Sequence, residues 1–120
     1  MVSASDSGAY TTADRYQVRD IDGRQVLFDG EGFFNDPDDW TESLAGILAK
    51  EMGLGDLGES QWRVIRFLRD FYYTNGRAPL NKQLKAGTGM SIMDMEGLFP
   101  GGIKHGARIL AGLPNPKSCL

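Results

Sequence analysis

The segment from Glu59 to Thr74 constrains the fold of this chain most strongly. It reads ESQWRVIRFLRDFYYT, and its large apolar side chains recur at the three- and four-residue intervals that place them on one side of an α-helix. Asn75 and Gly76 come next, a pair that commonly ends a helix. We therefore expect a central helix that buries Trp62, Ile65, Phe67, Leu68, Phe71 and Tyr72.

The other side of this helix is basic, because arginine recurs every three residues at Arg63, Arg66 and Arg69. A row of this kind is most often a solvated face, and that is the interpretation we favour here. The alternative is a binding surface for an anionic partner.

A β-hairpin is expected before the central helix. The segment YQVRDIDGRQVLFD alternates apolar and polar residues on both sides of Asp22-Gly23, a dipeptide suited to a type I′ turn. A turn-rich link, DGEGFFNDPDDW, leads into residues 36–39, which resemble a helix entry. The next helix should end at Gly53 and bury Trp40, Leu44, Ile47, Leu48 and Met52.

Three shorter helices are expected after the central one. Pro79 opens the first, which runs through Leu84 and Ala86 until residues 87–89 (Gly-Thr-Gly) break it. An apolar helix before Pro100 uses methionine as irregular core filler and contains Met90, Ile92, Met93, Met95, Leu98 and Phe99. The last helix spans about Gly102 to Leu113, ends at Pro114, and points Ile103, Ile109 and Leu110 inward.

Length and composition indicate one small domain, because 120 residues with 41% hydrophobic side chains suffice for a single core. We expect a disordered tail at residues 1–13, a mainly α domain at residues 14–113 and a flexible arm at residues 114–120. The sequence contains no run of 18 apolar residues, and it has a single cysteine. Both features predict a soluble protein of a reducing compartment, the cytoplasm.

The segment AGLPNPKSCL (residues 111–120) contains the arm, and the arm holds the single thiol, at Cys119. Pro114 and Pro116 restrict the backbone, which favours an extended and semi-rigid arm. The six steps from Leu113 to Cys119 span at most about 20 Å. The thiol could therefore enter the active site of another protein, or the arm could fold back on its own domain.

Nearby cations would make this thiol reactive. A free thiol with a pKa near 8.5 is only about 3% ionised at pH 7, and lowering that pKa by about 1.5 units makes it half ionised. Candidate thiolate-stabilising groups are Lys104, His105, Arg108 and Lys117. Three of them also have a structural explanation, since Arg108 suits the carboxyl end of a helix dipole, Lys117 suits a solvated tail and His105 suits an exposed surface.

Charge and motif content disfavour two other classes of function. Residues 1–60 hold 4 Lys/Arg against 13 Asp/Glu, whereas residues 61–120 hold 9 against 3. The basic half could meet an acidic protein or RNA, or match the acidic half internally. A regulatory or DNA-binding protein remains an alternative, although a pI near 5.0 disfavours direct nucleic-acid binding. A stand-alone hydrolase would need a preorganised nucleophile and base, which this pattern lacks.

The helix WRVIRFLRDFY (residues 62–72) and the ending AGLPNPKSCL (residues 111–120) resemble the DsrC/TusE/DsvC family. The resemblance covers Tyr16 to Leu120. It implies a small orthogonal helical bundle of about five helices with an N-terminal β-hairpin. It also implies a sulfur carrier of dissimilatory sulfite reduction or of tRNA 2-thiouridine synthesis, which bears a persulfide on Cys119 and needs no cofactor or metal.

Departures from the family pattern refine this expectation. Family members that act in dissimilatory sulfite reduction have a second cysteine where this chain has Arg108, so an intramolecular disulfide and a trisulfide shuttle are excluded. His105 and Lys82 stand where the family often has Lys and Arg. The resemblance is thus to the single-cysteine, TusE-like branch, a relay component between an upstream persulfide donor and a downstream acceptor. The alternative partner is a sulfite reductase or heterodisulfide-reductase-like complex.

Overall fold

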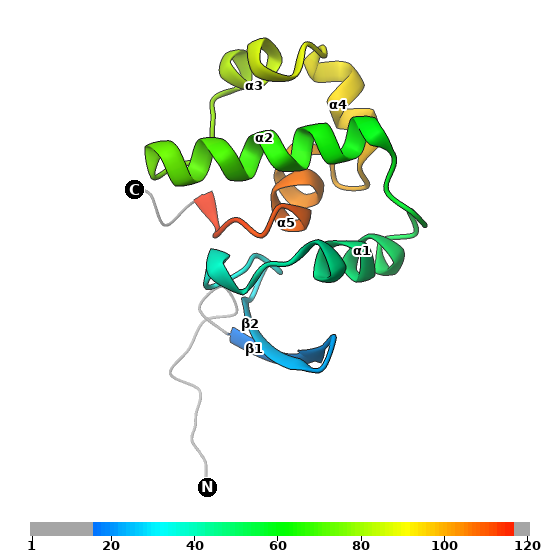
Figure 1. Ribbon diagram of the computed structural model, residues 1–120, viewed down its shortest axis with the longest axis vertical. Helices are drawn as coiled ribbons and strands as arrows, with labels where there is room; N and C mark the ends of the chain where they lie inside the picture. Colours follow the sequence, from blue (N-terminus) through cyan, green and yellow to red (C-terminus); the bar gives the residue numbers. More distant parts are fainter. Residues whose placement is uncertain (1–15, 117–120) are drawn as a thin grey trace, which may run out of the picture.

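The computed structural model describes residues 16–116, which fold into a hairpin and a set of helices. The long helix α2 crosses the middle, α3 and α4 lie on one side of it, and α5 and α1 lie on the other, with the hairpin farther out (Figure 1). This is the mainly α architecture expected from the sequence. The elements are β1 (Tyr16–Ile21), β2 (Arg24–Asp29), the 3₁₀ turn η2 (Pro37–Asp39), α1 (Glu42–Glu51), α2 (Glu59–Asn75), α3 (Asn81–Thr88), α4 (Ile92–Leu98), the π-helical η3 (Ile103–Ala107) and α5 (Arg108–Leu110).

The predicted hairpin is confirmed. Strands β1 and β2 pair antiparallel, with Tyr16 opposite Asp29 and Ile21 opposite Arg24. The two turn residues have positive φ angles, 56° at Asp22 and 75° at Gly23, as a type I′ turn requires. Because side chains alternate between the two faces of each strand, one face of the hairpin packs against the helices. Its buried side chains are Ile21, Val26 and Phe28.

Helix α2 is central, as its sequence pattern predicts. Ile65 and Leu68 are fully buried, and so is Val64, whereas the aromatic side chains of the same face are only half-buried. Arg63 and Arg66 are exposed, in agreement with a solvated face. Within residues 16–116, every helix is too short or too polar to span a bilayer.

The expectation that Trp40 belongs to the first helix is wrong. The Thr41 hydroxyl accepts a hydrogen bond from the Leu44 N–H at 3.0 Å, and this cap makes α1 begin at Glu42. Pro37–Asp39 form a separate 3₁₀ turn, η2, that the Asp36 side chain caps. Leu44 and Leu48 are buried as predicted, and the chain leaves α1 at Gly53 with φ of 88°.

Two expectations for α3 and α4 also need correction. Gly87 and Thr88 remain helical. Close packing of α3 on α2 favours glycine at 87, because a Cβ there would overlap the Phe67 ring. Met95 fills the core as expected, but Met93 is 82% exposed. Residues two positions apart point to nearly opposite sides of a helix, so both could not face inward.

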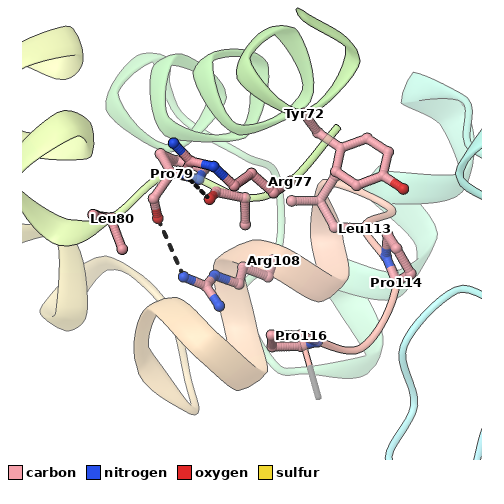
Figure 2. Close-up of a pocket in the computed structure, with 9 residues that line it drawn as sticks. Tyr72, Arg77, Pro79, Leu80, Arg108, Leu113, Pro114 and Pro116 are labelled. Atoms are coloured by element: carbon pink, nitrogen blue, oxygen red, sulfur yellow. Dashed lines mark hydrogen bonds between the residues drawn. The ribbon is translucent and has the colours of Figure 1, made fainter. Parts of the chain in front are cut away.

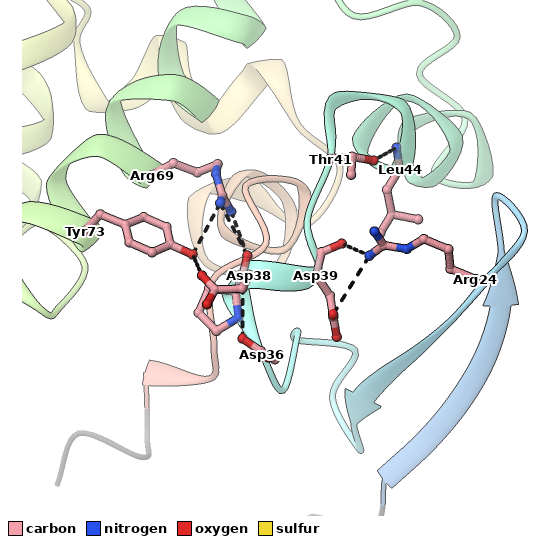
Figure 3. A network of polar contacts seen from close by, with 9 residues as sticks. Arg24, Asp36, Asp38, Asp39, Thr41, Leu44, Arg69 and Tyr73 are labelled. Atoms are coloured by element: carbon pink, nitrogen blue, oxygen red, sulfur yellow. Dashed lines mark hydrogen bonds and ion pairs between the residues drawn. The ribbon is translucent and has the colours of Figure 1, made fainter.

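Polar contacts join η2 to the neighbouring elements (Figure 3). Arg69 of α2 donates to the Pro37 carbonyl at 3.3 Å, and the Tyr73 hydroxyl donates to the Asp38 carboxylate. Burial and this hydrogen bond raise the pKa of Tyr73 above its ordinary value. Arg24 of β2 donates to the Asp39 carbonyl. The acidic turn is thereby fixed between the hairpin and the central helix.

Candidate functional site at the root of the arm

The last helical segment, α5, ends at Leu110, earlier than the sequence pattern predicts. Gly112 has φ of 73°, and its N–H donates to the Ile109 carbonyl at 2.9 Å. The Leu113 N–H donates to the Arg108 carbonyl at 3.1 Å, which completes a Schellman motif, and the Leu113 side chain is buried beneath it. Pro114 therefore comes after the end of the helix instead of causing it. We call residues 112–116 the arm root.

The segment before this end is wider than an α-helix. The Arg108 N–H donates to the carbonyl of Ile103, five residues earlier, so η3 is one π turn. One extra residue in a turn rotates the residues after it by about 100° relative to a continuous α-helix. His105 and Arg108 consequently face different neighbours. His105 Nε2 lies 3.5 Å from Glu31 Oε1, whereas Arg108 faces the arm root.

Trp40 and Arg69 hold the last carbonyls of this segment. Trp40 Nε1 donates to the Leu110 carbonyl at 2.6 Å, and Arg69 Nη1 donates to the Ala111 carbonyl at 2.8 Å. The Arg69 guanidinium also lies 4.1 Å from the centroid of the Trp40 ring. Arg69 is therefore an exception to the solvated row on α2, because it satisfies carbonyls at a helix end that would otherwise lack partners.

The last residue of β2 holds the arm root from another side. Asn115 Nδ2 donates to Asp29 Oδ2 at 3.0 Å. The other carboxylate oxygen of Asp29 accepts from the N–H groups of Glu31 and Phe33, both at 2.9 Å. Phe33 is fully buried. Since Asp29 is itself fixed by its loop, the start of the arm has a defined place on the domain.

An open cleft of about 230 Å³ lies beside the arm root. Pro114 and Pro116 form part of its wall, and the link between α2 and α3 forms another part (Figure 2). Most of the lining is apolar. The residues around it are Tyr72, Arg77, Ala78, Pro79, Leu80, Arg108, Leu113, Pro114 and Pro116.

Two guanidinium groups give this cleft a positive charge. Arg77 Nη1 donates to the Ala78 carbonyl at 3.3 Å, and Arg108 Nη2 donates to the next carbonyl, that of Pro79, at 3.4 Å. Figure 2 shows both side chains at the link before α3. Within residues 16–116, no acidic side chain lines the cleft, which therefore suits an anion with an apolar part.

Comparison with known proteins identifies the chain. Residues 20–120 match the family model described as DsrC like protein. The chain belongs to the DsrC-like family. The gamma subunit of dissimilatory-type sulfite reductase from Nitratidesulfovibrio vulgaris is 34% identical over 98 residues, which cover 82% of this chain and 93% of that protein. The sulfurtransferase TusE of Pectobacterium atrosepticum is 32% identical over 108 residues, covering 84% and 98%.

The fold supports the same assignment. The crystal structure of the oxidised gamma subunit of the dissimilatory sulfite reductase (DsrC) from Archaeoglobus fulgidus superposes with a TM-score of 0.74 and 31% sequence identity. The match covers 87% of this chain and all of that one. The resemblance stated from residues 62–72 and 111–120 is thereby confirmed as family membership.

The structure describes three of the five site residues predicted for this DsrC-like protein, and these three have different surroundings. Among those described, Arg108 lines the cleft, His105 pairs with Glu31, and Lys104 is exposed. Cys119 and Lys117 lie outside the described residues. Of the three expected cations that are described, Arg108 is the one that the structure places beside the arm root.

Sequence reasoning missed Arg77 as a member of the site. Arg77 shares no helix with Arg108, so no helical spacing connects the two in the sequence. The two come together because α2 ends at Asn75, Gly76 caps it, and the chain then turns beside the arm root into α3. The available clue was Pro79, which is buried and fixes the course of the link.

Proposed function

We propose that this protein carries sulfur as a persulfide on Cys119, in the cytoplasm. The observation that carries the proposal is the position of Pro116 in the wall of a cationic cleft, with the only cysteine three residues farther along the sequence. Those three residues span at most about 10 Å. A thiol on so short a tether stays near the cleft and can still enter the active site of a docked partner.

The transfer exchanges one disulfide-type bond for another, so it needs no external oxidant or reductant. The Cys119 thiolate attacks the outer sulfur of a donor persulfide, a new S–S bond forms, and the donor cysteine leaves as a thiolate. The proton on the outer sulfur stays with it or passes to solvent. An acceptor thiolate then attacks that same outer sulfur, and Cys119 leaves as a thiolate in turn.

The cations around the arm favour the ionised sulfur in this proposal. Arg108 and Arg77 lie at the cleft, and Lys117 lies two residues before the thiol in the sequence. A positive charge near a thiol lowers its pKa and stabilises it as a leaving group. Lys104 and His105 would act on the same sulfur only when the arm lies over η3. Catalytic groups for the acceptor step would come from the partner.

The pathway that we propose is a relay toward tRNA 2-thiouridine. A single cysteine supports it, because the sulfur must be passed to another protein when no second thiol exists in the chain. The second candidate is a carrier for a sulfite reductase or heterodisulfide-reductase-like complex. It is favoured by the 34% identity to the gamma subunit of a sulfite reductase.

A host strain without this gene distinguishes the two pathways. The strain is complemented with the native protein, with Cys119→Ser or with Ser118→Ala. Cys119→Ser removes the sulfur, whereas Ser118→Ala changes the neighbouring residue of the arm and keeps the sulfur. We expect Cys119→Ser to reduce tRNA 2-thiouridine, measured by mass spectrometry of nucleosides, to the level of the deletion strain. Ser118→Ala should retain it.

The opposite result would contradict the proposed tRNA pathway. Normal 2-thiouridine in the Cys119→Ser strain would exclude the tRNA relay. Retention of a sulfite reductase on immobilised native protein, with the interaction weakened by removal of residues 117–120, would then support the second candidate.

A further inference from the structure

The surface of α3 and α4 has an exposed apolar centre. Met93 of α4 is 82% exposed, the largest fraction among the large hydrophobic side chains that the structure describes. Two open hollows, of about 360 Å³ and about 560 Å³, adjoin at Met90, which lines both. The first lies over the turn between α3 and α4, and the second lies between α4 and the start of α2. We call the surface over both hollows the α3–α4 face.

The charges of the α3–α4 face are arranged by sign. Lys82 and Lys85 line the first hollow, Asp94 lines the second, and all three side chains are exposed. The two lysines are three residues apart on α3, so they project to the same side. Among the described residues, no acidic side chain lines the first hollow and no basic one lines the second. The face is therefore positive at one end, apolar at Met90 and Met93, and negative at the other end.

This arrangement of charge complements an α-helix. The peptide dipoles of a helix leave a partial positive charge at its amino end and a partial negative charge at its carboxyl end. A helix with its carboxyl end at Lys82 and Lys85 and its amino end at Asp94 meets opposite charge at both ends. Methionine side chains are unbranched and adapt to an irregular apolar surface, so Met90 and Met93 suit the apolar stripe of such a helix.

Nucleic acid fits the same face poorly. In a helix-turn-helix protein the second helix enters the major groove of DNA, and the corresponding element here would be α4. This helix contains Asp94 and Glu96 but no lysine or arginine. Both carboxylates are exposed, so they would repel the phosphates of a bound duplex. The observations favour a protein partner.

We propose that the α3–α4 face binds an amphipathic helix of a partner protein, with its apolar side chains on Met90 and Met93 and its carboxyl end at Lys82 and Lys85. None of these four residues lines the cleft beside the arm root. A partner held on this face therefore leaves the arm root open for sulfur exchange with a second protein. The docking itself does not depend on the chemistry of Cys119, and neither does its test.

Two synthetic helical peptides of equal composition test the proposed orientation. Each is about 18 residues long, has leucines on one face and is held helical by a side-chain lactam bridge, because free peptides of this length are only marginally helical. The matched peptide has lysines in its first turn and glutamates in its last turn, and the reversed peptide exchanges them. We expect the full-length protein to bind the matched peptide about three- to tenfold more tightly in fluorescence anisotropy titrations, as a few exposed ion pairs would produce.

Substitutions show whether the peptide binds on the α3–α4 face. Met93→Glu puts a charge in the apolar centre and should weaken binding of the matched peptide about tenfold or more. Lys85→Glu should abolish or reverse the preference between the two peptides. Lys50→Glu makes the same change of charge on α1, across α2 from the face, and should leave both affinities unchanged (Figure 1). All three positions are exposed, so these variants should fold like the native protein.

Several results would overturn the proposal. Equal affinities of the native protein for the two peptides would reject the orientation, and unchanged binding by Met93→Glu would reject the site. Binding of a DNA duplex that Lys85→Glu abolishes, without peptide binding, would assign the face to nucleic acid. In a host extract, the matched peptide should displace proteins from the immobilised native protein more effectively than the reversed peptide does. Equal displacement by both would contradict the use of this face in the cell.

Discussion

Gly112→Ala should destabilise the protein by about 2–4 kcal/mol, since an alanine there meets both a backbone and a packing penalty. The native φ of 73° is left-handed, and a Cβ would lie 2.5 Å from Cδ1 of Trp40. The Trp40 ring cannot move aside freely, because it donates to the Leu110 carbonyl and packs on Arg69. Urea unfolding followed by tryptophan fluorescence measures the loss.

Gly76→Ala provides the matched control at the end of α2. Gly76 has φ of 76°, nearly the same as Gly112, but an added Cβ meets no atom within 4 Å. Only the backbone penalty remains, so we expect a loss of about 1 kcal/mol. Equal losses in the two variants would mean that the contact between Trp40 and the arm root has no energetic weight.

Arg108→Cys should convert the protein into one that closes an intramolecular disulfide under mild oxidation. Arg108 and Pro116 line the same cleft, and Cys119 lies within about 10 Å of Pro116 along the chain. A disulfide requires Cα atoms about 4.4–6.8 Å apart, a separation that this tether allows. We expect nearly complete loss of both free thiols in thiol titration, with the protein remaining monomeric on non-reducing gels.

A cysteine placed elsewhere on the surface distinguishes proximity from general reactivity. Arg63→Cys lies nine residues before Tyr72 on α2, about 13 Å along the helix axis from the cleft. This variant should form intermolecular disulfides only. If Arg108→Cys also formed only intermolecular disulfides, Cys119 could not reach position 108. The distance that we expect residues 117–119 to span from the arm root would then be wrong.

The elements with strong local patterns could be predicted from the sequence. The alternation around Asp22-Gly23 and the periodicity of α2 each identified an element correctly, because burial of one face dominates both. Trp40 was misassigned for a related reason. Its spacing to Leu44 fits a helix, but the Thr41 cap decides where α1 starts, and a local hydrogen bond carries no periodicity.

The candidate site was predictable only in part. The thiol and Arg108 lie close in sequence, so the ending of the chain suggested both. Arg77 and Asp29 reach the arm root through tertiary contacts, at the Ala78–Pro79 link and at Asn115. The π turn in η3 separates His105 from Arg108, and nothing in the spacing of this segment distinguishes it from an ordinary helix.

Intact-mass analysis after incubation with a persulfide donor tests the carrier role most directly. The native protein should gain the mass of one sulfur atom, lose it on addition of an acceptor thiol, and show no gain after Cys119→Ser. A native protein that gains no mass from any persulfide donor, or a Cys119→Ser variant that gains as much as the native chain, would contradict the proposal that Cys119 carries the sulfur.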